Sequence, residues 1–114
     1  MAIENVIGGG ANAGLTETGI SAAGTAQATA TQLKAEHSEV TTVASGAGVI
    51  LSSLFATGQE QTVFNATSTA LKVYPPSGFQ INSLVVNSAI TLAPQTGVMF
   101  KCISTSRIFG VLSA

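Results

Sequence analysis

The residue types that could support chemistry gather around His37, which stands between Glu36 and Glu39. An imidazole beside two carboxylates could hold a metal ion or take part in proton transfer. The sequence has one histidine and no aspartate, so further ligands for a metal centre are scarce. Short polar runs of this kind are typical of solvated turns, and we expect no metal site here.

A cysteine nucleophile is the second candidate. Cys102 is the one cysteine of the sequence, and His37 could act as its base. Cys102 also alternates with Val98 and Phe100 along a predicted strand, where cysteine is typically a small core residue. We favour the core position, and a lone cysteine forms no intrachain disulfide.

Three weaker motifs complete the search for chemistry. Gly8, Gly10 and Ala13 satisfy a loose dinucleotide fingerprint, but no βαβ unit follows them. The sequon at 65–67 lacks a secretory signal. Tyr74 could stack on a ligand, although packing against the adjacent prolines is the interpretation we favour. Residues for chemistry are too few, so we predict that the protein is not an enzyme and uses no cofactor.

The composition favours association with other proteins. Charged residues make up 8% of the 114 residues, against about 25% in an ordinary soluble domain. With a net charge of −1, little repulsion keeps copies apart, so we expect self-association. The cations are scattered and form no basic patch for nucleic acid; they are Lys34, Lys72, Lys101 and Arg107.

Neither a signal peptide nor a membrane span is predicted. The N-terminus carries Glu4 and lacks a basic region before its short apolar run. The longest apolar stretch, residues 47–56, contains two serines and is much shorter than a bilayer requires. We expect a soluble protein that is made inside a cell and has no membrane partner.

The chain divides into two segments of different texture. Residues 1–25 are rich in glycine and alanine, which predicts an extended arm ordered by contact with a neighbour. Residues 26–114 are predicted to form a β-structured body. Residues 25–36 contain good helix formers but also alternating threonines, so we favour a strand and keep a short helix as the alternative.

Short alternating segments predict an all-β body. The segments at 39–44 and 49–53, which the turn "SGAG" joins, are predicted to form a hairpin. Pro75, Pro76 and Gly78 end one strand and predict a corner between two sheet segments. Strands are expected at 39–44, 49–53, 61–66, 70–75, 89–93, 97–103 and 107–113.

Strand spacings near ten residues predict a small sandwich or jelly-roll-like body, with a barrel as a further possibility. One face of each strand should form the core. The expected core residues are Val63, Leu71, Val73, Ile81, Ile90, Leu92, Val98 and Phe100.

Three stretches together resemble a module of tailed-bacteriophage virion proteins, found in capsid decoration (cement) proteins and in head or tail fibres. They are "SAAGTAQATATQLKAEHSEVTTVASGAGVIL", "VFNATSTALKVYPPSGFQINSL" and "TGVMFKCISTSRIFGVLS". The likeness runs from about Gly19 to the C-terminus. The chain departs from it at Ile108 and Phe109, where a tryptophan is frequent, and at Ser83, where a glycine is frequent.

The resemblance implies a β-structured homotrimer on a virion. We expect a decoration protein that is assembled in the host cytoplasm, binds the major capsid protein on the capsid surface and reinforces contacts between shell subunits. A fibre or tailspike module that contacts the host surface is the alternative. A small enzyme or ligand-binding barrel is the weakest hypothesis, because titratable residues are so sparse.

Two sets of apolar residues are assigned to these contacts. The arm is expected to bury its apolar side chains on the capsid and to bend at residues 8–10. The strand faces opposite the core are expected to form the trimer interface. The capsid-binding residues are Ile3, Val6, Ile7 and Leu15, and the trimer-interface residues are Phe64, Met99, Ile103 and Phe109.

Overall fold

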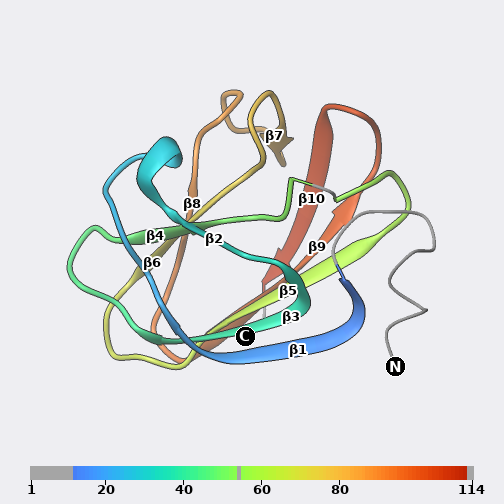
Figure 1. Ribbon diagram of the computed structural model, residues 1–114. Coiled ribbons are helices and arrows are strands. Elements are labelled where there is room, and N and C mark those ends of the chain that lie inside the picture. Colours follow the sequence, from blue (N-terminus) through green and yellow to red (C-terminus); the bar gives the residue numbers. More distant parts are fainter. Residues whose placement is uncertain (1–11, 54, 113–114) are drawn as a thin grey trace.

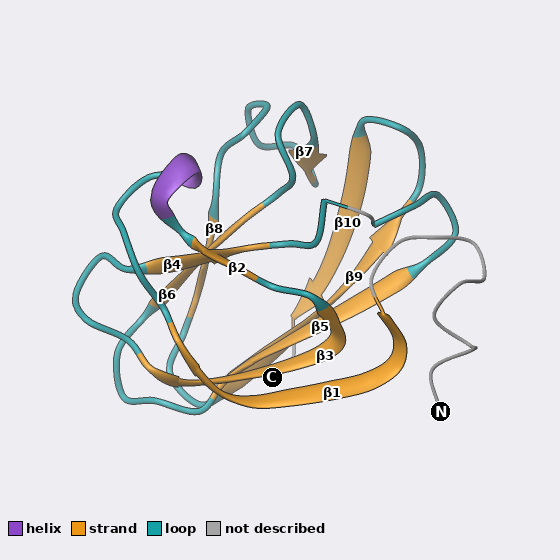
Figure 2. Cartoon of the chain, viewed as in Figure 1, coloured by secondary structure: helices purple, strands orange, loops and turns teal. Residues whose placement is uncertain are grey.

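The fold is known from a computed structural model, which describes residues 12–53 and 55–112 (Figure 1). This part of the chain consists of short strands joined by turns, with a single 3-10 helix, η2 (Figure 2). The elements are β1 Asn12–Ser21, η2 Gln27–Thr29, β2 Thr31–Gln32, β3 Ala35–Thr42, β4 Gly48–Ile50, β5 Glu60–Asn65, β6 Leu71–Tyr74, β7 Gln80–Ile81, β8 Ile90–Leu92, β9 Thr96–Cys102 and β10 Arg107–Leu112.

The strands form two sheets, and the chain alternates between them. Sheet A has the order β1-β3-β5-β9-β10-β7, and sheet B has the order β2-β4-β6-β8. In both sheets the first three strands are parallel, and β1, β3 and β5 run side by side in Figure 1. The pairing becomes antiparallel in the later part of each sheet: β8 pairs with β6 in sheet B, and β9 pairs with β5 and β10 in sheet A. The result is a β-solenoid of about four turns.

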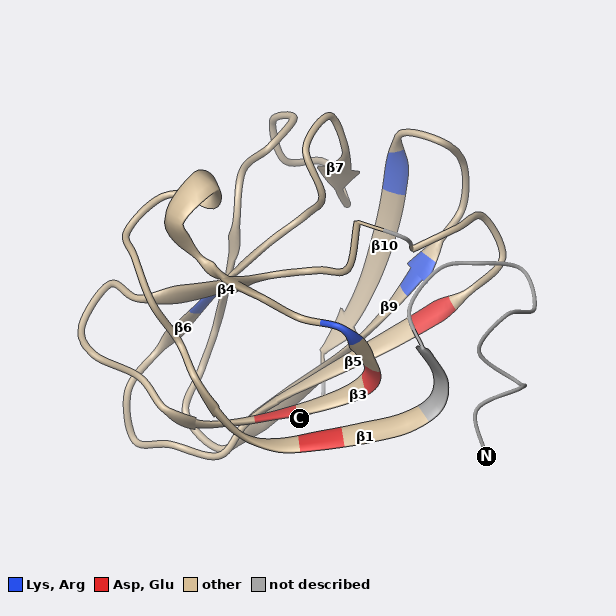
Figure 3. Cartoon of the chain, in the orientation of Figure 1, with Lys and Arg blue, Asp and Glu red and all other residues tan. Residues whose placement is uncertain are grey.

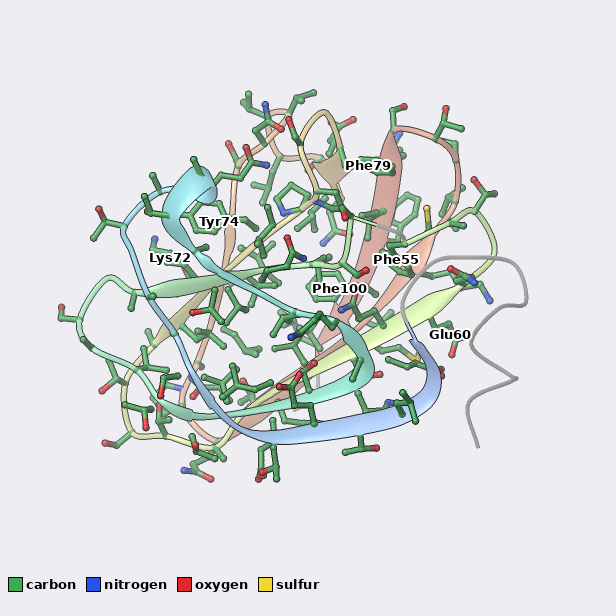
Figure 4. The ribbon with its side chains drawn as sticks, viewed as in Figure 1. Phe55, Glu60, Lys72, Tyr74, Phe79 and Phe100 are labelled. Atoms are coloured by element: carbon green, nitrogen blue, oxygen red, sulfur yellow. The ribbon has the colours of Figure 1, made fainter. Side chains whose placement is uncertain are left out.

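The two sheets enclose one apolar core. Phe100 is fully buried between them, whereas Glu60 lies exposed at the start of β5 (Figure 4). Of the expected core residues, all are buried except Ile90, which is partly buried and packs against the others. Cys102 is also buried, as its alternation with Val98 and Phe100 predicts.

Glycine allows close approach at two places in the winding. A Cβ atom on Gly48 in β4 would lie 2.8 Å from the carbonyl oxygen of Lys72 in the neighbouring strand β6. Gly24 has φ +70°, and a Cβ there would lie 2.2 Å from Thr29 Oγ1. A side chain at Gly48 would push β4 away from β6, and one at Gly24 would displace the helix η2, so the two glycines fix the spacing of two strands and the path of one connection.

The predicted sandwich or jelly roll is wrong, although the all-β class is confirmed. The predicted hairpin is wrong for the same reason, because β3 lies in sheet A and β4 in sheet B. Alternation shows that a strand has one buried face, but it carries no information about which strand lies beside it. The "SGAG" turn leads from one sheet to the other, and Ala47 N–H donates to the Ala44 carbonyl within it.

The corner after β6 is confirmed. Tyr74 ends β6 in sheet B, and the chain re-enters sheet A at Gln80. Pro75 and Pro76 are buried, and Gly78 has φ +88° in the turn. The two prolines therefore end β6, as the sequence predicts, because proline has no backbone N–H with which to continue the strand pairing.

The N-terminal third differs from its prediction in two ways. Residues 12–21 of the expected arm form β1, which pairs in parallel with β3, while residues 1–11 lie outside the described part. Residues 25–36 contain both of the alternatives: the helix η2 and the strand β2. A window of alternating threonines and helix formers supports each conformation over a few residues only.

Candidate functional site

The polar side chains around His37 make local contacts at the surface of sheet A. His37 Nε2 lies 3.9 Å from Glu36 Oε2, and the carboxylate of Glu39 accepts a hydrogen bond from the hydroxyl of Thr18. Within residues 12–53 and 55–112, no group of three or more His, Cys or carboxylate side chains comes together as a ligand set. These side chains belong to the surface of sheet A.

Cys102 has the environment of a core residue. Its Sγ lies 3.2 Å from the Ser104 carbonyl oxygen and 3.9 Å from that of Phe55. Burial raises the pKa of the Cys102 thiol, because the thiolate would be poorly solvated. A protonated thiol bonded to backbone carbonyls is a poor nucleophile at neutral pH.

Asn65, the acceptor residue of the sequon, is buried and structurally engaged. Its Nδ2 donates to the carbonyls of Thr69, at 2.9 Å, and Leu92, at 3.1 Å. Its Oδ1 accepts from the backbone N–H and the hydroxyl of Thr67. The amide ties the β5–β6 turn to β8, and a glycan on this nitrogen is incompatible with that position.

Tyr74 is likewise held by the fold. It is half-buried, and its hydroxyl donates to the Thr25 carbonyl at 3.3 Å. Its ring lies against Gly48, where an added Cβ would be 2.9 Å from Tyr74 Cε2. Phe79 is partly buried and packs against the core. These two aromatic residues therefore support the corner, and their rings are not free-standing platforms.

The outer face of sheet A carries the largest grouping of exposed apolar side chains that the register brings together. Thr62, Met99 and Val111 lie in one row across β5, β9 and β10. Phe64 lies opposite Gly97 in the next row. We call Phe64, Met99, Phe109 and Val111 the sheet A patch; all four are exposed.

A shallow depression of about 230 Å³ lies over this part of sheet A, between the row of Met99 and the end of β10. Its floor is mostly apolar, and Phe64, Val111 and Leu112 line it. The depression is open, and Thr62 supplies the one polar side chain of its lining, whereas small-ligand sites usually combine an enclosed cavity with several convergent polar groups. Such a surface suits contact with another protein better than chemistry on a substrate.

Charged side chains border the sheet A patch on one side. Lys101 Nζ lies 3.3 Å from Glu60 Oε2, and Phe109 pairs with Lys101 across the strands. The guanidinium of Arg107 lies 4.9 Å from the centre of the Phe109 ring, a distance at which a cation is attracted to the ring face. Phe109 is therefore oriented by its neighbours although it is exposed.

Sheet A is also polarised from one edge to the other. Its acidic residues lie on β1, β3 and β5, and its basic residues lie on β9 and β10 (Figure 3). The acidic side carries Glu17, Glu36, Glu39 and Glu60, and the basic side carries Lys101 and Arg107.

A second exposed apolar surface lies in the turn between β7 and β8. We call Leu84, Val85 and Val86 the apolar loop; Val85 is 76% exposed. Two asparagines with positive φ bracket it, Asn82 and Asn87. Asn87 Oδ1 accepts from the backbone N–H of Gly78 at 2.7 Å, and Asn87 N–H donates to the Phe79 carbonyl. The loop is thus anchored at its base while its tip projects into solvent.

The structure places the predicted contact residues unevenly. Phe64, Met99 and Phe109 lie together on the outer face of sheet A. Ile103 is exposed in the turn after β9, separated from Met99 by Lys101, and Leu15 is exposed on β1. The remaining arm residues Ile3, Val6 and Ile7 lie outside the described residues.

Val111 and the apolar loop were not predicted from the sequence. Val111 shares the parity of Phe109 on β10, so the same alternation could have identified it. The loop shows as three apolar residues between two Asn-Ser pairs, "NSLVVNS".

No helix of the described residues is long and apolar enough to cross a membrane. No family model matches the chain, and comparison with curated proteins and with solved structures finds no match.

Proposed function

We propose that this chain is a virion structural protein that decorates a tailed-phage capsid as a homotrimer and reinforces contacts between major capsid protein subunits. The phage setting comes from the resemblance of three sequence stretches to virion modules. The observation that carries the contact role is the sheet A patch, a cluster of exposed apolar side chains on the outer face of a β-solenoid.

The sheet A patch supports self-association. Complete burial of a fully exposed large apolar side chain contributes about 1.5–3 kcal/mol. Phe64 is 46% exposed, so covering it contributes roughly half of that. The patch repeats on every copy, so several such contributions add at each interface. Met99, Phe109 and Val111 would be covered together with Phe64, whereas Ile103 would lie at the rim.

The polarity of sheet A supports a ring of copies. When copies meet head to tail, the acidic strands of one protomer face the basic strands of the next, and such an interface forms a ring when the rotation between successive copies closes. Surface charges contribute little affinity individually, but they favour this orientation over one that brings like charges together. A trimer is the ring that the virion resemblance implies.

Decoration needs a second surface that faces the shell. The apolar loop supplies one, because its tip is exposed and its base is held by Asn82 and Asn87. The N-terminal residues 1–11 are the other candidate; fully extended they would reach about 35 Å. Bridging neighbouring shell subunits through several weak contacts raises the overall affinity without any single strong one.

Co-sedimentation with capsid shells tests the proposal. The purified protein should bind shells that lack it, and deletion of residues 1–11 should reduce binding while leaving β1 and the trimer intact. Binding to host cells or glycans, with no binding to shells, would favour the fibre or tailspike alternative. Unchanged occupancy after the deletion would refute the role of residues 1–11.

A further inference from the structure

One row of side chains crosses the outer face of sheet A from β1 to β10. His37 on β3 lies opposite Thr62 on β5, and Thr62 lies opposite Met99 on β9. The row continues to Thr16 on β1 and to Val111 on β10. Directly opposed residues of adjacent strands project from the same face of a sheet. We call these five residues the His37 row; it connects the imidazole to the sheet A patch.

The His37 row carries no fixed charge, unlike the rows on either side of it. The next row in one direction includes Glu39, and the next row in the other direction includes Glu60 and Lys101. The centres of protein interfaces are depleted of charged residues and enriched in residues such as methionine. Histidine is the one member of the row whose charge changes near neutral pH. The row is therefore suited to the centre of an interface when His37 is neutral.

The area that a stable contact needs extends past the sheet A patch to His37. A standard interface covers about 800 Å² of each partner, which is a disc of roughly 16 Å in radius. Strands β3, β5 and β9 are consecutive in sheet A (Figure 1), so β3 lies roughly 10 Å from β9. On the other side of the patch the sheet soon ends, because only the two-residue strand β7 follows β10. An interface built on the patch therefore spreads across β5 onto β3.

The charged groups around His37 within one copy are all acidic on its own and the two adjacent strands. The His37 side chain is 41% exposed, and its Nε2 lies 3.9 Å from Glu36 Oε2. Its own strand also carries Glu39, β1 carries Glu17 and β5 carries Glu60. Attraction between these carboxylates and a protonated imidazole is present in the free copy too, and at an exposed surface it contributes little. It therefore does not favour assembly.

We propose that the interface between copies covers His37, and that protonation of His37 dissociates the trimer. This inference rests on the trimer proposed above. Covering an imidazolium removes it from water without a new partner, which is costly. In a head-to-tail ring β3 also faces the basic strands of the next copy, which carry Lys101 and Arg107, so a positive charge on His37 meets like charge. Both effects have the same sign: the trimer is stable at neutral pH and dissociates in mild acid.

Sedimentation at about pH 7.5 and about pH 5.5 tests this inference, because His37 is the one histidine of the sequence. The concentration at which half of the trimer dissociates should be at least about tenfold higher in acid. His37→Gln cannot be protonated and should abolish this difference. His37→Gln/Val85→His is the matched control, because it returns one imidazole to an exposed position in the apolar loop. This double variant should also remain trimeric in acid.

A permanent charge at the same position gives a second test. His37→Lys should be dissociated at both pH values, while its circular dichroism spectrum remains that of the folded chain. A trimer that is equally stable at both pH values would overturn the inference and leave the trimer standing, as would equal dissociation of the original protein and either His37→Gln protein in acid. A protein that is monomeric at both pH values would instead refute the trimer itself, and the inference with it.

Discussion

The ring of Phe64 lies directly over Gly97. The two residues are paired across β5 and β9, and a Cβ atom placed on Gly97 would lie 2.8 Å from Phe64 Cδ1. An aromatic ring that covers a glycine in the adjacent strand shields its backbone and lies flat on the sheet. The ring of Phe64 therefore has a fixed orientation within the sheet A patch.

Gly97→Ala should displace the Phe64 ring and weaken self-association. The added methyl group requires the ring to move, whereas the backbone of β9 can accept alanine because Gly97 does not have positive φ. We expect the trimer of this variant to dissociate at a several-fold higher protein concentration than that of the original protein, while the circular dichroism spectrum is unchanged. Thr41→Ala, on the exposed part of β3, is the control. Equal dissociation of both variants would contradict the role of the ring.

Phe64→Asp and Phe109→Asp should each yield monomers or aggregates. Both side chains are exposed on the outer face of sheet A, so the fold of the single chain should survive. A carboxylate in a covered apolar interface is costly because it cannot be solvated. Sedimentation equilibrium provides the measurement, and an intact trimer in either variant would remove that residue from the interface.

Val85→Asp should reduce capsid binding without changing the oligomeric state. The apolar loop projects from its asparagine anchors, so the substitution alters its tip but not its base. We expect binding to shells to fall by about tenfold, the loss of about 1.4 kcal/mol. Ser83→Asp, which adds the same charge two residues away, is the control. A loss of the trimer instead would place the loop in the self-contact.

Ser38→Ala should stabilise the protein. Ser38 is fully buried, and its hydroxyl has no hydrogen-bond partner among the described residues. Removing a buried unpaired hydroxyl should raise the free energy of unfolding by about 1 kcal/mol. Thr67→Ala should lower it, because the Thr67 hydroxyl bonds to Asn65 Oδ1 at 2.7 Å. Urea unfolding of the two variants compares them, and a Ser38→Ala protein that is less stable would contradict the prediction.

The buried thiol predicts a loss of stability at alkaline pH. The pKa of Cys102 is raised in the folded chain, so the unfolded chain releases the thiol proton at a lower pH than the folded chain does. The free energy of unfolding should be unaffected at neutral pH and fall as the pH rises above the ordinary pKa of a cysteine thiol. Cys102→Ala should lack this part of the slope; an identical pH profile in both proteins would show that the thiol does not contribute.

The strands and most of the core were predictable from sequence because alternation reports burial directly. Val63, Val98 and Phe100 follow the period of two that a half-buried strand requires, and all are buried. The prolines after Tyr74 likewise predicted the corner. These signals are local, since each depends on residues within one strand or turn.

The winding of the chain was not predictable in the same way. Alternation is the same for a strand whose next neighbour is a hairpin partner and for one that lies a full solenoid turn away. Val49 and Val40 each occupy a buried position, yet they belong to different sheets. The apolar loop was missed because the exposure of its tip depends on the asparagine anchors at its base, which form only when distant segments meet.

Image reconstruction of capsid particles incubated with the purified protein tests the central claim most directly. The account predicts three-fold density of the size of three solenoids on the outer surface of the shell, lying across junctions between major capsid protein subunits. A shell without added density, together with a protein that sediments as a monomer, would contradict it.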